Sequence, residues 1–170
     1  MVGHNKNDPL SSKGARNSYY KNLLKRDEAK YLIGFTDDFG IFPCDKEVRS
    51  MMHNTLKLVQ NLGHEISNTY PDMSKSEYCF QTLRAYMFYC TYKSLLKKDK
   101  SLIKEEVIWN INRAKAITID DLLEAEKARA GIYNDTMKFF DKFDFLILPS
   151  SIVPPFNSQN KWVKKVEGTT

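Results

Sequence analysis

Two adjacent serines, Ser150 and Ser151, are the residues of this sequence that most resemble a nucleophile, because they directly follow an apolar segment and Pro149. A serine nucleophile needs a neighbouring base and a sharp turn, usually flanked by glycine, that exposes its hydroxyl group. No glycine flanks this pair and no base stands beside it. The pattern favours hydroxyl groups that satisfy backbone groups at the end of a strand, and it assigns no catalytic residue.

Metal-binding and cofactor-binding patterns are missing from the sequence. Zinc sites need several cysteines or histidines at characteristic spacings, and the three histidines and three cysteines here form no such pattern. A phosphate-binding loop needs clustered glycines, but the seven glycines lie far apart. We therefore expect no metal and no cofactor.

Two aspartate pairs, Asp37–Asp38 and Asp120–Asp121, could in principle act as paired carboxylates. Consecutive side chains diverge on regular secondary structure, so neither pair is expected to face a common point. The second pair is better explained as favourable negative charge at the start of a helix.

The element that must position the serine pair is the apolar run Phe145–Leu148. A run without polar alternation predicts a strand buried on both faces, as in a parallel sheet covered by helices. Pro149 ends the strand because proline cannot donate a hydrogen bond to the sheet. Ligands of open α/β sheets bind beyond the carboxyl ends of strands. Ser150 and Ser151 are therefore candidates for substrate contact, and an ordinary exit turn is the alternative.

The first part of the sheet is predicted from three consecutive segments. Residues 31–36 are rich in aromatic and branched side chains, which is typical of a strand, and Gly34 inside it indicates a close approach by another group. Asp45 is a good N-cap for a helix that Gly63 ends. A short strand over residues 64–67 follows. Strand, helix and strand with short connections predict two parallel strands in a βαβ unit.

Three further helices are predicted before the last strand. Ser74 with Glu77 indicates a capping box for a helix reaching about residue 98, and Thr118 with Asp121 indicates another, for a helix ending near residue 141. A shorter helix lies between them, over residues 105–115. Aromatic residues are spread around the first of these helices, which predicts burial on more than one side by core packing rather than a ligand site. The fold class is therefore α/β, with parallel or mixed strands packed with helices.

Composition bounds the class of protein. The chain has 170 residues and a net charge of +5, with lysines spread along it. One domain is the default at this length, and nucleic-acid binding is not expected because acidic residues intersperse the lysines and no motif is present. An odd cysteine count argues against a disulfide framework and for a reducing compartment. No run approaches membrane-spanning length and residues 1–30 hold no apolar signal core, so we expect a cytoplasmic protein without membrane contact.

The chain divides into three parts by composition. Residues 1–30 are polar and rich in turn formers, and we interpret them as a connector. Residues 31–156 carry all the predicted strands and most of the helical signal, and residues 157–170 form a polar, basic tail.

Several short motifs, in order along the chain, resemble the carboxyl-terminal half of the amidase signature family. Each motif is weak alone, but their common order over residues 2–156 is specific. They include the stretch from Gly3 to Ser11, the helix start Pro43–Arg49, the strand entry Leu62–Ile66, the closing helix Thr118–Arg129, the strand Phe143–Pro149 and the pair Pro154–Pro155.

The resemblance implies an amide-bond hydrolase of the Ser-Ser-Lys type. Neither the family's glycine- and serine-rich signature nor its upstream lysine can be matched here, so no catalytic residue carries over. Ser150 and Ser151 stand where the family usually shows a threonine after or near a proline, so the resemblance implies that they line a pocket edge and are not the nucleophile. Tyr78–Leu96 lacks the Glu-Ala-Ser-Ser-Asn stretch of the glutamyl-tRNA amidotransferase A subunit, which implies a closer likeness to stand-alone amidases.

Two functional hypotheses follow. The first is a fragment of an amidase that lacks the catalytic segment, is inactive alone, has an incomplete core, and either pairs with an amino-terminal amidase half or self-associates. The second is a non-catalytic binding or interaction module with a basic surface. A parallel strand that is buried on both faces needs neighbours, which favours the first hypothesis.

Overall fold

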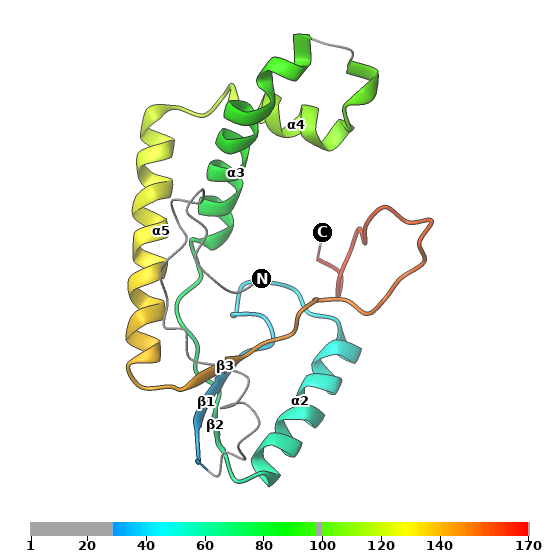
Figure 1. Ribbon diagram of the computed structural model, residues 1–170. Helices are drawn as coiled ribbons and strands as arrows, with labels where there is room; N and C mark the ends of the chain where they lie inside the picture. The colour runs from blue at the N-terminus through cyan, green and yellow to red at the C-terminus, as the bar shows by residue number, and fades with distance from the viewer. Residues whose placement is uncertain (1–28, 98–99, 170) are drawn as a thin grey trace, which may run out of the picture.

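The computed structural model describes residues 29–97 and 100–169, and it contains a three-stranded parallel sheet in the lower part of Figure 1. The strands are β1 (Leu32–Phe35), β2 (Glu65–Ser67) and β3 (Phe145–Ile147), in the order β2–β1–β3. Ile33 pairs with Ile66 on one side and with Phe145 on the other. The predicted α/β class with parallel strands and helices is confirmed.

The βαβ unit forms as the sequence predicts. Helix α2 (Lys46–Asn61) connects β1 to β2, and the side chain of Asp45 accepts a hydrogen bond from the Glu47 N–H at 2.8 Å. Gly63 follows the helix with a φ of 91°, in the left-handed region that glycine adopts without steric cost. One face of α2 buries Val48, Met52 and Leu56, because these residues recur at helical spacing.

A helical layer follows the unit. Helix α3 (Ser76–Tyr92) continues into the short 3-10 helices η1 (Lys93–Lys97) and η2 (Lys100–Leu102). Helices α4 (Glu105–Ala114) and α5 (Ile119–Phe140) both pack against α3. Small buried residues, Ala85, Ala125 and Ala128, allow the helices to approach closely. In Figure 1 the strands lie between α2 and the carboxyl-terminal end of α5.

Gly34 joins the helical layer to the sheet. A Cβ atom at this position would lie 2.5 Å from Cζ of Phe139 and 2.5 Å from the carbonyl oxygen of Thr69. The ring of Phe139 also stacks on Phe143, with centroids 4.6 Å apart. The close approach predicted at Gly34 is therefore confirmed, and α5 can rest on β1 only because this residue has no side chain.

The prediction that Phe145–Leu148 is buried on both faces is wrong within this chain. Strand β3 lies at the edge of the sheet, and Phe145 and Leu148 are 50% and 46% exposed. A continuous apolar run indicates a strand that needs cover on both faces, and the described residues supply only part of it.

Two predictions about α3 are also wrong. The helix begins at Ser76 after Lys75, which makes no side-chain cap, and Ser74 instead donates its N–H to Asp72 Oδ1 at 2.8 Å. The expected burial on more than one side is not found: the buried residues of α3 are Cys79, Thr82 and Ala85, whereas several large side chains are exposed, namely Tyr78, Phe80, Tyr86 and Met87.

Helix α5 carries an apolar face that nothing described covers. We call it the α5 stripe: Ile119, Leu123, Tyr133, Met137 and Phe140 are all exposed and recur at helical spacing. The buried side of the same helix is the opposite one. Among the described residues, exposed large hydrophobic side chains outnumber buried ones. The described residues therefore form a core that leaves much apolar surface uncovered.

The ends of the chain differ in how far they are described. The expected connector, residues 1–30, lies almost entirely outside the described residues. In the tail, Val166 pairs with Thr169, and Glu167 lies 3.5 Å from Lys46 Nζ at the start of α2. Within the described residues, no helix combines the length and the apolar character needed to cross a lipid bilayer.

Candidate functional site

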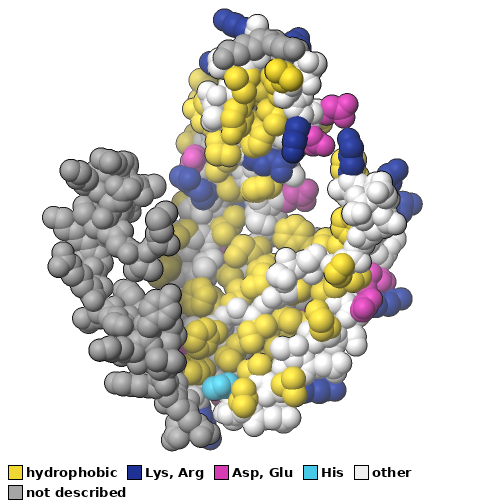
Figure 2. Space-filling model, turned by 45° about the vertical axis from the view of Figure 1, so that its right-hand side comes forward, with side chains coloured by type: hydrophobic (Ala, Val, Ile, Leu, Met, Phe, Trp, Pro, Cys, Tyr) yellow, Lys and Arg dark blue, Asp and Glu magenta, His cyan; other side chains and the backbone are white. Residues whose placement is uncertain are grey.

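A groove of about 720 Å³ lies between α2 and the segment that follows β3. We call it the α2 groove. Figure 2 shows hydrophobic side chains gathered across the middle of the face formed by α2 and neighbouring segments. The residues that line the groove are Glu47, Val48, Met51, Met52, Thr55, Pro149, Ser150, Ser151, Val153, Pro154, Pro155 and Phe156.

Backbone hydrogen bonds place the segment over α2. Thr36 N–H donates to the carbonyl oxygen of Ile147 at 3.1 Å, which holds the end of β3 against β1. Asp45 N–H then donates to the carbonyl oxygen of Ile152 at 2.9 Å, which ties the segment to the start of α2. Pro149 restricts the backbone between these contacts, and Pro154 and Pro155 restrict it just beyond them, so this wall of the groove is stiff.

Ser150 and Ser151 both line the groove and both are exposed. The Ser151 hydroxyl donates to the carbonyl oxygen of Val153 at 2.8 Å and accepts from the Val153 N–H at 3.3 Å. Its backbone role, preferred on sequence grounds, is confirmed. Ser150 bonds to no described residue through its hydroxyl, so this group is the one available to a ligand. Contact of either serine with a substrate stays a prediction.

The groove has the walls of a binding site but lacks the usual base for a serine nucleophile. The residues that line it include no lysine and no histidine, and a serine hydroxyl needs such a base to attack an amide. Cys44 is no substitute, because burial raises the pKa of its thiol and leaves little thiolate. Among the described residues, no group of three or more histidine, cysteine or acidic side chains is placed to hold a metal ion.

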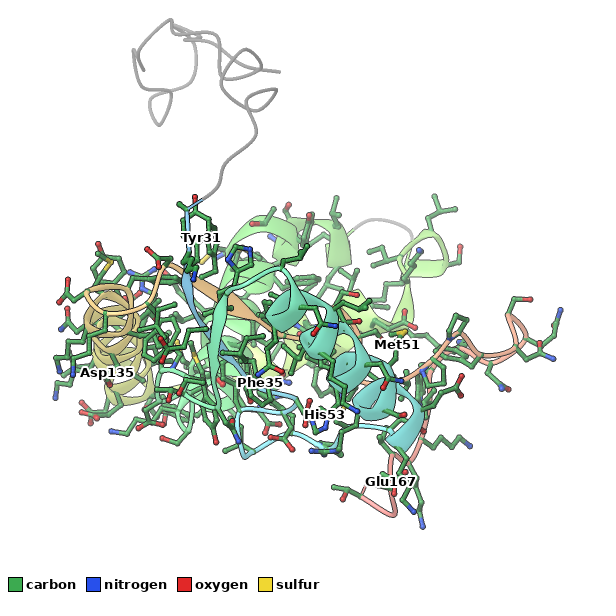
Figure 3. The ribbon with its side chains drawn as sticks, turned by 90° about the horizontal axis from the view of Figure 1, so that it is seen from below. Tyr31, Phe35, Met51, His53, Asp135 and Glu167 are labelled. Atoms are coloured by element: carbon green, nitrogen blue, oxygen red, sulfur yellow. The ribbon has the colours of Figure 1, made fainter. Side chains whose placement is uncertain are left out.

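An ionic cluster on the other side of α2 was not predicted. Arg49 donates from Nη1 to Asp37 Oδ2 at 3.1 Å and from Nη2 to Asp38 Oδ2 at 3.0 Å. His53 Nε2 lies 3.0 Å from the same Asp37 oxygen. In Figure 3, His53 points toward Phe35 of the sheet, whereas Met51 lies on the side of α2 near the segment after β3.

The expectation that Asp37 and Asp38 diverge is wrong because they lie in a turn rather than on regular structure. Thr36 Oγ1 accepts from the N–H groups of Asp38 and Phe39, and Phe39 has a φ of 53°. This turn brings both carboxylates to one guanidinium. The hydrogen bond to the Asp38 carboxylate raises the pKa of Arg49 above its ordinary value. The available signal was the βαβ unit itself, which places the first turn of α2 beside the end of β1.

The cluster has a positioning role for the groove. The Asp37 side chain is only 10% exposed, and its Oδ1 is buried without a described hydrogen-bond partner. A carboxylate that is largely removed from water keeps its charge at a low free-energy cost only if its partners, here Arg49 and His53, compensate for the lost hydration. Arg49 therefore holds the amino-terminal half of α2, and with it one wall of the groove, against the end of β1.

Solved structures share this fold. A bacterial aryl acylamidase of the amidase signature enzymes matches with a TM-score of 0.79 and 16% identity, over 98% of this chain and 37% of that chain. The 6-aminohexanoate cyclic dimer hydrolase matches with a TM-score of 0.69 and 13% identity, over 89% of this chain and 34% of that chain. The complex of that hydrolase with its substrate matches with a TM-score of 0.71 and 14% identity, over 98% of this chain and 37% of that chain. The chain thus has the fold of amidase signature enzymes and spans little more than a third of their length.

The sequence makes the same assignment at the level of the family. A profile of the amidase family matches residues 1–168, and the chain belongs to that family. A comparison with curated proteins gave no match.

Proposed function

We propose that this chain forms a substrate-binding part of an amidase, and that the Ser-Ser-Lys residues for hydrolysis lie on a segment outside these 170 residues. The observation that carries this proposal is the α2 groove, which has apolar walls and the Ser150 hydroxyl but neither a lysine nor a histidine. In this proposal Ser150 contacts the amide group of the substrate, and Ser151 shapes the wall beside it.

The proposed partner is a segment that corresponds to the amino-terminal half of an amidase. The similar structures are nearly three times as long as the part that matches this chain, which leaves ample sequence to supply a partner. The edge of β3 and the α5 stripe expose the apolar surface that such a partner would cover. Self-association through the same surface is the alternative when the partner is missing.

Two finer points belong to the same proposal. We place the chain nearer to stand-alone amidases than to the glutamyl-tRNA amidotransferase A subunit, since that subunit's Glu-Ala-Ser-Ser-Asn stretch is missing from residues 78–96. The aryl acylamidase and the cyclic dimer hydrolase among the structural neighbours support this placement. Three free cysteines, Cys44, Cys79 and Cys90, support a reducing compartment and hence the cytoplasm.

The test is an assay of acetanilide hydrolysis by the purified chain, alone and after co-expression with an amidase segment that carries the signature serines and the lysine. We expect background hydrolysis from the chain alone, because no described serine has a base beside it, and activity from the pair. A matched pair in which that lysine is replaced by alanine is the control. Robust hydrolysis by the chain alone would contradict the proposal. Salt-dependent retention on nucleic acid, without rescue by the partner, would favour the interaction module.

A further inference from the structure

One acidic side chain, Glu47, stands among the apolar residues of the α2 groove. It is the only ionisable residue that lines the groove. Glu47 is exposed, and its backbone N–H is used by Asp45, but its carboxylate makes no ion pair or hydrogen bond with a described residue. The groove therefore presents one unpaired negative charge beside an apolar wall.

The cations nearest to Glu47 in sequence are occupied by other carboxylates. Lys46 lies 3.5 Å from Glu167 through its Nζ atom. Arg49 is shared between Asp37 and Asp38 on the other side of α2. Neither cation neutralises Glu47, so its charge is available to a ligand.

We propose that the α2 groove binds amides whose apolar group ends in a protonated amine, and that Glu47 recognises this amine. The inference rests on the proposed function, because it takes the α2 groove to be the substrate groove. From Glu47 to Thr55 the lining spans two turns of α2, about 12 Å along the helix axis. This length is enough for an extended alkyl or aryl group to lie along α2 with its amine at Glu47. The attraction between the two charges is stronger beside an apolar wall than in bulk water.

The exposure of Glu47 sets how strongly the groove should prefer an amide with a protonated amine over a neutral amide. An exposed ion pair favours binding by about two- to fivefold, and salt screens it. The positive end of the α2 dipole offsets part of the negative charge of Glu47. The amine therefore adds selectivity to binding that the apolar walls already supply.

Methionine methyl groups provide the readout in the full chain. Met51 and Met52 line the groove, whereas Met73, Met87 and Met137 do not. With methyl-labelled methionine, N-hexylacetamide and N-(6-aminohexyl)acetamide should both shift the resonances of Met51 and Met52 and leave those of Met73, Met87 and Met137 unchanged. We expect the amine to bind about two- to fivefold more tightly at low salt and to lose this advantage as salt is raised.

Substitution separates the two proposals. Glu47→Gln should abolish the preference, so that the protonated amine and the neutral amide bind with equal Kd values. The matched control is Glu77→Gln, which changes a glutamate in the first turn of α3 away from this groove, and it should keep the preference. A preference that persists in Glu47→Gln, or equal affinities in the unsubstituted chain, would overturn the inference alone. No shift at Met51 or Met52 with either amide would overturn it together with the proposed substrate groove.

Discussion

At the scale of single residues, the most informative contact is the one between Arg49 and two consecutive aspartates. The side chain of Asp37 is nearly buried, and its Oδ2 atom contacts both Arg49 and His53. Exposed pairs on α5, such as Arg129 with Glu126, have water as an alternative partner. The two kinds of pair should therefore contribute very differently to stability, although each involves one arginine and a carboxylate.

Replacing Arg49 tests this difference. We expect Arg49→Met to lower the free energy of unfolding by about 2 kcal/mol, because a nearly buried carboxylate loses its main charged partner. Arg129→Met is the matched control and should cost less than about 1 kcal/mol, since both members of its pair are exposed. Urea unfolding followed by circular dichroism measures both values. Equal losses in the two variants would show that the cluster has no special role.

At the scale of elements, two similar sequence signals behave differently. Thr118 and Asp121 form a complete capping box at the start of α5, with the Thr118 N–H donating to Asp121 Oδ2 at 2.8 Å and the Asp121 N–H donating to Thr118 Oγ1 at 3.1 Å. Ser74 and Glu77 have the same spacing but form no such box, because α3 begins later, at Ser76. Spacing alone does not decide which residue takes the non-helical conformation of an N-cap.

Alanine substitutions should separate the two signals. Thr118→Ala is expected to lower stability by about 1 kcal/mol, whereas Ser74→Ala should stay within about 0.5 kcal/mol of the parent. Thermal unfolding of both variants is the measurement, and a larger loss in Ser74→Ala would contradict the assignment. The hydrogen bonds from Thr118 lower the pKa of Asp121. The contribution of Asp121 is therefore present above the ordinary aspartate pKa and is lost as the pH falls through the lowered value.

At the scale of the whole molecule, the main feature is apolar surface that no described residue covers. The α5 stripe lies opposite the side of α5 that packs against α3. Its flanking charges are already paired within the helix, as Lys127 is with Glu124 and Lys138 with Asp135. A large exposed apolar stripe of this kind favours association with another surface.

The purified chain should therefore self-associate in a concentration-dependent way. We expect the double substitution Leu123→Glu with Met137→Glu to shift it toward monomer, because both side chains are about half exposed in the stripe. The control is Lys127→Gln with Lys138→Gln, which changes the net charge equally but leaves the stripe intact. Analytical ultracentrifugation measures the masses. A clean monomer of the unsubstituted chain at all concentrations would refute the prediction.

Local patterns were sufficient to predict most of the helices and strands and the segment after β3 that carries Ser150 and Ser151. The βαβ unit, the N-cap Asp45, the stop at Gly63 and the close contact at Gly34 follow from interactions between near neighbours or from the lack of a side chain. The ionic cluster was missed because its residues come from a turn and from a helix. The sequence of the turn does not show which helix residue its carboxylates contact, and only the crossover connection brings Arg49 to Asp37 and Asp38.

Hydrophobic periodicity, turn residues and the order of motifs along the chain were enough to indicate the α/β class, the order of the elements and the amidase resemblance. The tertiary structure alone decided that β3 is an edge strand, that α3 and α5 expose large side chains, and that Glu47 faces an apolar groove. An apolar residue in the sequence indicates that its burial would be favourable, but it does not show whether other residues lie close enough to bury it. Only the positions of the neighbours in space show which surfaces they leave uncovered.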